Sequence, residues 1–441
     1  MLKKSNLIFI LVVSFLGYGF GKDFDIRKVL QLAEENNKDI KLARNDLEFA
    51  RAQKKEAISL ALPSINANVN YNRNFLENKL FFTVTDSSGR ETTQSFTASF
   101  TNTYQFSTSL NQTLFGFGKI GNAIQAAGYF NKYSNFAYQA QYNVIITSIK
   151  KAFYLALLLN KVWEVAVQSE KSAEENYQNI KIKYDGGAVS EYDLLQAETR
   201  WKNSIPLTMQ ARKDYELALN NLKALVDIPL REEVNLVGDL DSFPRLPDSL
   251  ESQIVFKQRP DFNALQWEKK LQEKRVAIEN SYYYPTLNGS LSYLYNASSN
   301  EFRLDNKNDN VILGISLSIP IFNGFYTSAQ VQKARIDVDR VKTRISKAYD
   351  DIRIEIKNIR LRMIEARERI EAGQSNIETA RRGFEIAETR IENGLATQLE
   401  LRESRVDLDR AQVNFYSAIY DYLAAYFDWQ NAIGEVNTAG I

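Results

Sequence analysis

The side chains that could do chemistry in this 441-residue chain are few in kind. There is no cysteine and no histidine, which excludes thiol nucleophiles, disulfides, thiolate metal sites and imidazole acid/base catalysis. An enzyme built from what remains would need paired Asp or Glu residues, with or without a metal. The acidic residues are instead spread along stretches with helical periodicity, and none form a compact cluster at ligand spacing. We therefore expect no enzyme activity, no cofactor and no metal site.

The overall charge gives no reason to expect a nucleic-acid partner. The chain has 55 Lys and Arg against 54 Asp and Glu, so its formal charge is +1. A protein that binds the phosphate backbone usually carries a basic patch or a strong positive excess. The apolar content of 44% is that of an ordinary folded protein.

The N-terminus has the pattern of a secretory signal peptide. Lys3 and Lys4 precede an apolar run at residues 7–16, and small residues follow at 19–21. The run is too short for a membrane-spanning helix, and no later stretch approaches the roughly 18 consecutive apolar residues that such a helix needs. We expect residues 1–21 to be a signal peptide, and the exported chain to be soluble, surface-bound or a β-barrel.

Four later segments of about ten residues alternate between polar and apolar side chains, as β-strands with two different faces do. Their length is that of transmembrane β-strands, and aromatic residues stand near their ends. The polar face is almost free of charge, which suits a hydrated lumen, whereas a solvated sandwich face would carry more Lys and Glu. The predicted lumen-lining residues are Ser64, Asn66, Asn68, Asn70, Gln105, Ser107, Ser109, Asn111, Asn288, Ser290, Ser292, Ser316 and Ser318.

Four strands are too few to close a barrel. An open edge in hydrocarbon leaves N–H and C=O groups unsatisfied, at a cost of several kcal/mol each. Two copies would give eight strands, whose interior is filled by side chains, whereas three give twelve and room for a channel. The strand count therefore predicts a homotrimer that shares one barrel.

An internal duplication organises the chain. Pro63 aligns with Pro285 at an offset of 222 residues, and Phe115 aligns with Phe322 at an offset of 207. The first copy therefore has 15 extra residues, which we expect to form a loop around residues 75–102. The predicted domains are a first repeat at 22–226, a Pro-rich linker or equatorial segment at 227–249 and a second repeat at 250–441.

Each repeat is predicted to end in a long antiparallel helical hairpin. Apolar or small residues recur at spacings of 4 and 3 over residues 145–184 and again, 207 residues later, over residues 352–391. A mean period of 3.5 sustained over several heptads is typical of a left-handed coiled coil. The first of these helices, from about Lys119 to Tyr184, would be about 100 Å long.

With these features in this order, the sequence resembles the outer membrane efflux protein family, the TolC-like channel-tunnels. The resemblance rests on Arg259-Pro260-Asp261, on Pro63 and Pro285 at strand entries, on the strand-to-helix passages 114–118 and 319–324, and on the turns with their following helices at 187–197 and 394–404. It covers essentially the whole mature chain.

The resemblance implies a membrane α+β fold. Three protomers would contribute four strands each to a 12-stranded β-barrel in the outer membrane, joined to a long α-helical coiled-coil tunnel in the periplasm. It also implies a function: the passive export duct of a tripartite efflux pump or a type I secretion system. Such a duct docks to a periplasmic adaptor protein and receives its substrates from an inner-membrane transporter.

The resemblance also implies site residues at the two hairpin turns. The tip or gate residues would be Tyr184, Ile391, Asp193 and Glu400. The carboxylates of Asp193 and Glu400 would be repeated around the trimer axis as a charged constriction. Ile391 and Ala396 stand where some family members carry a gating Tyr and Arg. The adaptor would dock near Gly186, Gly187, Ser190, Gly394 and Thr397.

Each of these assignments has a structural alternative. The carboxylates could belong to a solvated helix face, the glycines could serve only to end a helix, and Ser190 and Thr397 could serve as helix caps. The alternative for the whole protein is an exported coiled-coil structural protein or adhesin without channel activity. That alternative explains the heptads, but it gives no reason for strands of membrane-spanning length in both repeats.

Overall fold

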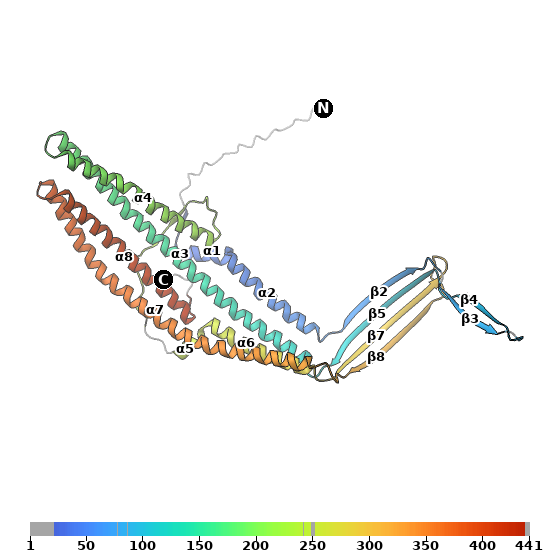
Figure 1. The fold of residues 1–441 in the computed structure, drawn as a ribbon. Coiled ribbons are helices and arrows are strands. Elements are labelled where there is room, and N and C mark those ends of the chain that lie inside the picture. Colours follow the sequence, from blue (N-terminus) through green and yellow to red (C-terminus); the bar gives the residue numbers. More distant parts are fainter. Residues whose placement is uncertain (1–21, 77, 86, 241, 248–251, 437–441) are drawn as a thin grey trace, which may run out of the picture. The chain divides into compact units, whose positions relative to one another are not determined.

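The computed structural model describes residues 22–76, 78–85, 87–240, 242–247 and 252–436 (Figure 1). The predicted signal peptide, residues 1–21, lies outside them. In chain order the elements are β1 (Lys22–Phe24), α1 (Ile26–Asn36), α2 (Lys38–Ser59), β2 (Ser64–Arg73), β3 (Lys79–Thr85), β4 (Glu91–Thr97), β5 (Asn102–Phe115), α3 (Lys119–Asp185), α4 (Glu191–Leu225), β6 (Val234–Leu236), α5 (Ser252–Gln258), α6 (Pro260–Ser281), β7 (Thr286–Ser299), β8 (Asn308–Ser318), α7 (Tyr326–Glu392) and α8 (Gln398–Ile433).

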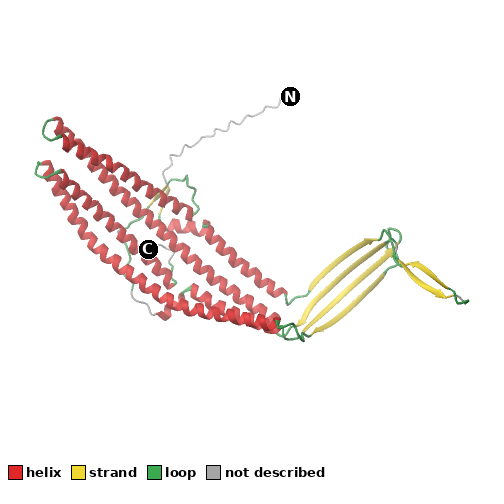
Figure 2. Cartoon of the chain, viewed as in Figure 1, coloured by secondary structure: helices red, strands yellow, loops and turns green. Residues whose placement is uncertain are grey.

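The predicted duplication is confirmed by the lengths and order of these elements. Helices α2 and α6 both have 22 residues and each leads into a strand. Helices α3 and α7 both have 67 residues, and the helices that return from them, α4 and α8, have 35 and 36. Each repeat thus supplies two shorter helices, two strands of the main sheet and one long helical hairpin (Figure 2).

The four predicted strands form one antiparallel sheet in the order β2-β5-β7-β8. The two repeats meet at its centre, where β5 pairs with β7 over nearly the full length of both strands. Strands β2 and β8 are the outer strands, and no strand in the described part of the chain pairs with their outer edges. The sheet is therefore open on both sides.

The extra segment of the first repeat is not the loop that we expected. It forms a separate two-stranded hairpin, in which β3 and β4 pair from Lys79 with Thr97 to Thr85 with Glu91. Both strands contain Thr and Phe, and β3 also contains Val, all of which favour extended backbone; Gly89 takes a φ of +78° between the strands. The length of the insertion was correct, but its conformation was wrong.

The chain divides into two compact units, each assembled from both repeats. One consists of Met1–Ala43, Gln139–Arg259 and Asp350–Ile441, and the other of Arg44–Tyr138 and Pro260–Tyr349. The first contains the helical hairpins and most of the buried core. The second contains the sheet, the β3–β4 hairpin and the helices that adjoin the strands.

The core of the first unit confirms the predicted heptad seam. Ile149, Ile359 and Met363 are fully buried, and other seam residues pack around them. The segment between the repeats covers part of this core. One contact between the two is a 2.8 Å hydrogen bond that the Tyr422 hydroxyl donates to the Pro244 carbonyl oxygen. Strand β6 of that segment also pairs in parallel with β1, which the sequence analysis had not predicted.

Helix α3 contains a stretch that is long and apolar enough to cross a membrane by composition, and just over half of that stretch is buried inside the protein. We had not expected such a stretch. The physical reason is visible in its packing, since Ile145, Ile146 and Phe153 all belong to the buried core of the first unit. These buried side chains of α3 pack within its own chain, whereas Val144 and Val167 of the same helix are exposed.

Lys150 is a buried cation in this core. Its side chain lies against Phe427, its Nζ is 3.3 Å from Gln430 Oε1, and burial lowers its pKa from 10.5 to about 8. Between these two values the unfolded chain holds a proton that the folded chain has released, so the free energy of unfolding rises with pH.

We expect this rise to be on the order of 2 kcal/mol between pH 8 and pH 10.5. It should be absent from a Lys150→Met variant, which should also be more stable than the parent protein at pH 7. Urea unfolding of detergent-solubilised protein across this pH range measures it. Lys171→Met, which removes an exposed lysine of the same helix, is the control and should keep the pH dependence. An unchanged pH profile in Lys150→Met would contradict the assignment.

Candidate functional site

The strand register places all thirteen predicted lumen residues on one face of the sheet. Asn66 lies opposite Ser109, and Ser109 lies opposite Ser292. On β8 the same face carries Ser316, which pairs with Asn288. Leu294 and Ile312 also belong to this face, although they were not among the predicted lumen residues. Their even spacing from Ser292 and Ser316 could have identified them. The polar surface is continuous except for these two apolar side chains.

The opposite face of the sheet is apolar and uncovered. Val69 is 77% exposed and Leu313 is 76% exposed, and Ile65 and Ile315 are similar. Residues of this face are neighbours across the strands, as Leu110 lies between Ile65 and Leu291. A large exposed apolar surface of this kind marks contact with a membrane or with another protein.

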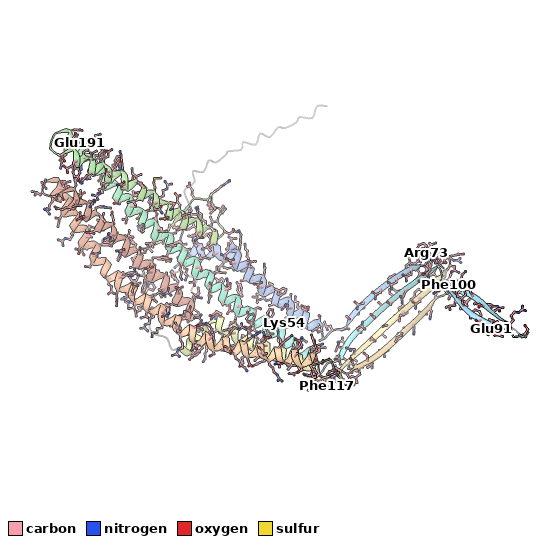
Figure 3. All side chains as sticks on the ribbon, in the orientation of Figure 1. Lys54, Arg73, Glu91, Phe100, Phe117 and Glu191 are labelled. Carbon is pink, nitrogen blue, oxygen red and sulfur yellow. The ribbon has the colours of Figure 1, made fainter. Side chains whose placement is uncertain are left out.

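Aromatic side chains gather at both ends of the strands. At the end near Arg73, the Tyr71 and Tyr104 rings have centroids 5.1 Å apart, and Phe302 packs against both. At the other end Phe117 stacks on Tyr284 with a centroid separation of 5.4 Å. Figure 3 labels Arg73 and Phe117 at these two ends. Aromatic belts at both boundaries are typical of proteins that cross a bilayer.

The two hairpin turns are built alike. Gly187 and Gly394 take left-handed φ angles of +74° and +71°, as predicted for residues that end a helix. The following N–H groups of Ala188 and Leu395 bond back to the carbonyls of Lys183 and Arg390, at 2.8 and 2.7 Å. These bonds satisfy the last carbonyls of α3 and α7. Gly186 has an ordinary backbone and is exposed.

The acidic residues predicted at the tip take part in helix capping. The Ser190 hydroxyl accepts a hydrogen bond from the Asp193 N–H, and the Asp193 carboxylate accepts from both the N–H and the hydroxyl of Ser190. At the second turn Thr397 caps α8 and contacts Glu400, whose carboxylate is also 3.5 Å from the Arg390 guanidinium. Contacts with the capping residue at the start of the helix therefore account for the position of each carboxylate.

The other two predicted tip residues lie in different surroundings. Tyr184 is exposed near the end of α3, whereas Ile391 packs against a small apolar cluster of Phe384, Leu401 and Leu408. No hydrogen bond or ion pair in the described part of the chain joins Asp193 to Glu400. Within one protomer the two acidic positions thus remain separate.

The Ser190 cap gives a direct prediction. Ser190→Ala should lower the free energy of unfolding by about 1 kcal/mol, because the first N–H groups of α4 lose their acceptor. The melting temperature of the purified protein measures this loss. Asn220→Ala, at an exposed position of the same helix, is the control and should leave the melting temperature nearly unchanged. Equal effects of the two substitutions would contradict the capping role.

The outer membrane efflux protein family model matches residues 29–226 and 252–435, which include all four strands of the main sheet and both helical hairpins. The chain belongs to the outer membrane efflux protein family. This family consists of channel proteins of the outer membrane and is not a family of enzymes. Among the residues that the structure describes, no three Asp or Glu side chains gather as a metal site would require.

Solved structures of channels share this fold. The CmeC outer membrane channel of Campylobacter jejuni is 23% identical, with a TM-score of 0.78, and the match covers 94% of this chain and 86% of that one. VceC, an outer membrane protein of Vibrio cholerae, is 17% identical with a TM-score of 0.74, over 93% and 96% of the two chains. The family fold thus extends over nearly all of this chain, including its strands, which an adhesin built only from coiled coils would lack.

Two relatives of known name share about a fifth of their aligned residues with this chain. The alkaline protease secretion protein AprF of Pseudomonas aeruginosa is 22% identical over 66% of this chain, and the match spans only 61% of AprF. TtgC of Pseudomonas putida, a probable efflux pump outer membrane protein, is 20% identical over 89% of this chain and 79% of its own length.

Proposed function

We propose that this protein is the outer-membrane channel of a tripartite efflux pump or a type I secretion system, through which substrates leave the cell passively. The observation that carries the proposal is the four-stranded sheet, with one polar face, one exposed apolar face and two unpaired edges. Such a sheet is stable in hydrocarbon only when further strands satisfy its edges. The family membership and the channel fold support the same function.

Three copies are the smallest assembly that fits a conducting channel. Each contributes four strands, so that β2 of one copy pairs with β8 of the next and twelve strands close around a bore. The thirteen polar residues then line water, while Val69, Leu313 and their neighbours face lipid. The aromatic side chains at the strand ends lie at the two membrane boundaries, and the helical hairpins extend into the periplasm.

A crosslinking experiment tests this assembly. Because the chain has no cysteine, engineered pairs report only on the chosen positions. Cysteines scanned over residues 66–70 of β2 and 308–312 of β8 should form disulfides between copies and yield a covalent trimer, whereas the same scan between β5 and β8 should not. The trimer should also conduct ions across a planar lipid bilayer. Protein that stays monomeric in mild detergent and never conducts would overturn the proposal.

The partners follow from the same proposal. In the proposed assembly an inner-membrane transporter supplies the energy and a periplasmic adaptor joins it to the hairpin turns. Relatives support both a secretion system and an efflux pump, since AprF is named as a protease secretion protein and TtgC as a probable efflux pump protein. Photocrosslinking residues placed at Ala188 and Leu395, beside Gly187 and Gly394, should capture the adaptor in whole cells. A photocrosslinking residue placed at Gln210, far along α4, should not capture the adaptor.

We also propose that Asp193 and Glu400 act at the tip as a ring of carboxylates that attracts cations. The capping contacts leave this role open, because a carboxylate can accept local hydrogen bonds and still contribute charge. Asp193→Asn, which keeps an oxygen acceptor for the cap, should lower the preference of the channel for cations with little change in melting temperature. Ser190→Ala should instead lower the melting temperature and leave the cation preference unchanged. A cation preference that Asp193→Asn leaves unchanged would leave capping as the role of Asp193.

A further inference from the structure

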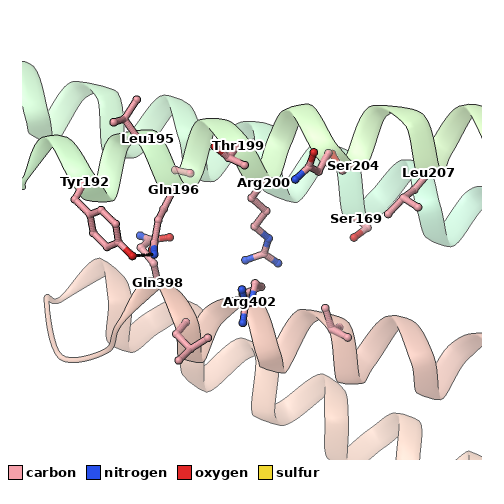
Figure 4. A pocket seen from close by; sticks show the side chains of 15 residues that line it. Ser169, Tyr192, Leu195, Gln196, Thr199, Arg200, Ser204, Leu207, Gln398 and Arg402 are labelled. Carbon is pink, nitrogen blue, oxygen red and sulfur yellow. Dashed lines mark hydrogen bonds between the residues drawn. The ribbon is translucent and has the colours of Figure 1, made fainter.

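A groove of about 660 Å³ runs between the two helical hairpins, a short distance from their turns. Its walls come mainly from α4 and α8, with Ser169 and Ala173 of α3 at one side. Arg200 of α4 and Arg402 of α8 reach into it from opposite walls, and Figure 4 shows their guanidinium groups pointing toward one another. Two like charges therefore face each other across the space that separates the hairpins.

In the part of the chain that the structure describes, neither Arg200 nor Arg402 forms a hydrogen bond or an ion pair. The charge of Asp409 acts on Arg200, but this carboxylate already lies beside Arg405, with Oδ1 2.9 Å from the Arg405 Nε. Those two atoms are close without being aligned for a hydrogen bond. The groove thus has an excess of positive charge.

The electrostatics of Arg200 agree with this geometry. Burial is the main cause that lowers its pKa, to about 10, and the charges of Arg402 and Arg405 lower it further, while Asp409 opposes them. The cationic form of a half-buried arginine is stabilised when an anion approaches it. A bound anion would therefore relieve both the burial and the like-charge repulsion.

The remaining lining suits a small oxyanion. The groove is lined by the amide side chains of Gln196, Asn203 and Gln398 and by the hydroxyl of Thr199, whereas the Ser204 hydroxyl already donates to the Trp201 carbonyl oxygen. Gln398 already accepts a 2.8 Å hydrogen bond from Asn176, which joins the two hairpins, and its NH₂ group remains a potential donor. Guanidinium groups bind carboxylate and phosphate oxygens through two parallel hydrogen bonds. The volume is that of a typical small-molecule site.

We propose that Arg200 and Arg402 form a binding site for a small dissolved oxyanion, a carboxylate or a phosphate, which bridges the two hairpins. The bound anion holds α4 against α8 near the turns. The arrangement of the hairpins then depends on the anions in the surrounding solution. This inference goes beyond the export function and does not require it.

Thermal unfolding of the full-length protein in detergent tests the site. Inorganic phosphate and citrate are titrated separately at constant ionic strength, with chloride as the balancing anion. The melting temperature of the parent protein should rise with saturation, by about 3 °C when the anion reaches roughly 100 times its dissociation constant. A response to citrate alone or to phosphate alone would identify which oxyanion the site takes.

Two variants and one control make the test specific. Arg200→Gln and Arg402→Gln should each remove the anion response. Each should also melt in chloride at or above the temperature of the parent protein, because one of two opposed charges is gone. Arg212→Gln, which removes an exposed arginine of α4 that pairs with Glu216, should keep the full response.

Two results would overturn the site. An equal response in all four proteins would show a general salt effect. An absent response in the parent protein, together with a lower melting temperature in Arg200→Gln, would show that a carboxylate of a neighbouring protein chain occupies the groove. Light scattering on the same samples reports the number of copies, so that a failure of trimer assembly is recognised separately.

Discussion

Val69→Arg is expected to prevent assembly of the protein in the outer membrane. Val69 stands in the middle of β2 on the apolar face and is 77% exposed in the protomer. An arginine at the centre of the lipid-facing surface of a barrel costs about 2–4 kcal/mol. In the proposed trimer that charge enters the membrane three times.

The neighbouring position provides the control for this prediction. Asn68 lies next to Val69 on the same strand but on the polar face, opposite Ser107. Asn68→Arg should assemble, insert and conduct, with a shift of ion preference toward anions, because three positive charges would line the bore of the proposed trimer. Heat-resistant trimers on gels and single-channel conductance measure the two variants. Similar behaviour of both variants, whether normal or defective, would contradict the assignment of the two faces.

Ile149→Asp is expected to unfold the helical part of the protein. Ile149 is fully buried in the seam of α3, among Ile146, Phe153 and other core residues. The substitution removes a large apolar side chain and puts a carboxylate in its place, so we expect a loss of about 4 kcal/mol or more in the free energy of unfolding. That is a large fraction of the stability of a typical domain.

Two comparisons sharpen the result. Ser148→Asp places the same charge on the adjacent, exposed residue and should cost well under 1 kcal/mol. Ile356→Asp, at the matching heptad position of the second repeat, should be intermediate, since Ile356 is only partly buried. The urea concentration at half-unfolding, measured by circular dichroism, ranks the three. A normal midpoint for Ile149→Asp would contradict the seam.

The features predicted well from the sequence are those with a regular period. The spacing of 3.5 fixed the seam of α3 and α7, and the spacing of two fixed which residues of β2 and β5 share a face. Both periods repeat in the second half of the chain, so that two independent stretches supported each prediction. The Schellman-type turns at Gly187 and Gly394 were also predictable, because only a few residue types end a helix in that way.

The features that the sequence did not predict depend on contacts between distant residues or on short segments. Strand β1 has three residues and acquires its conformation from β6, more than 200 residues away. The capping role of Glu400 competes with any role in a gate, and residue type alone does not separate the two. The approach of Arg200 to Arg402 depends on how two separate hairpins lie side by side. Such arrangements follow from packing, which periodicity does not describe.

The β3–β4 hairpin has a consequence for the biology of the cell that carries this protein. It extends from the end of the sheet opposite to the one that enters α3 (Figure 1), so under the proposed topology it is displayed on the outside of the bacterium. Antibodies and bacteriophages that approach the cell would contact this hairpin, on which Phe81 and Phe82 are exposed aromatic side chains. A short epitope inserted beside Gly89 should be recognised on intact, unpermeabilised cells and would leave the export route undisturbed.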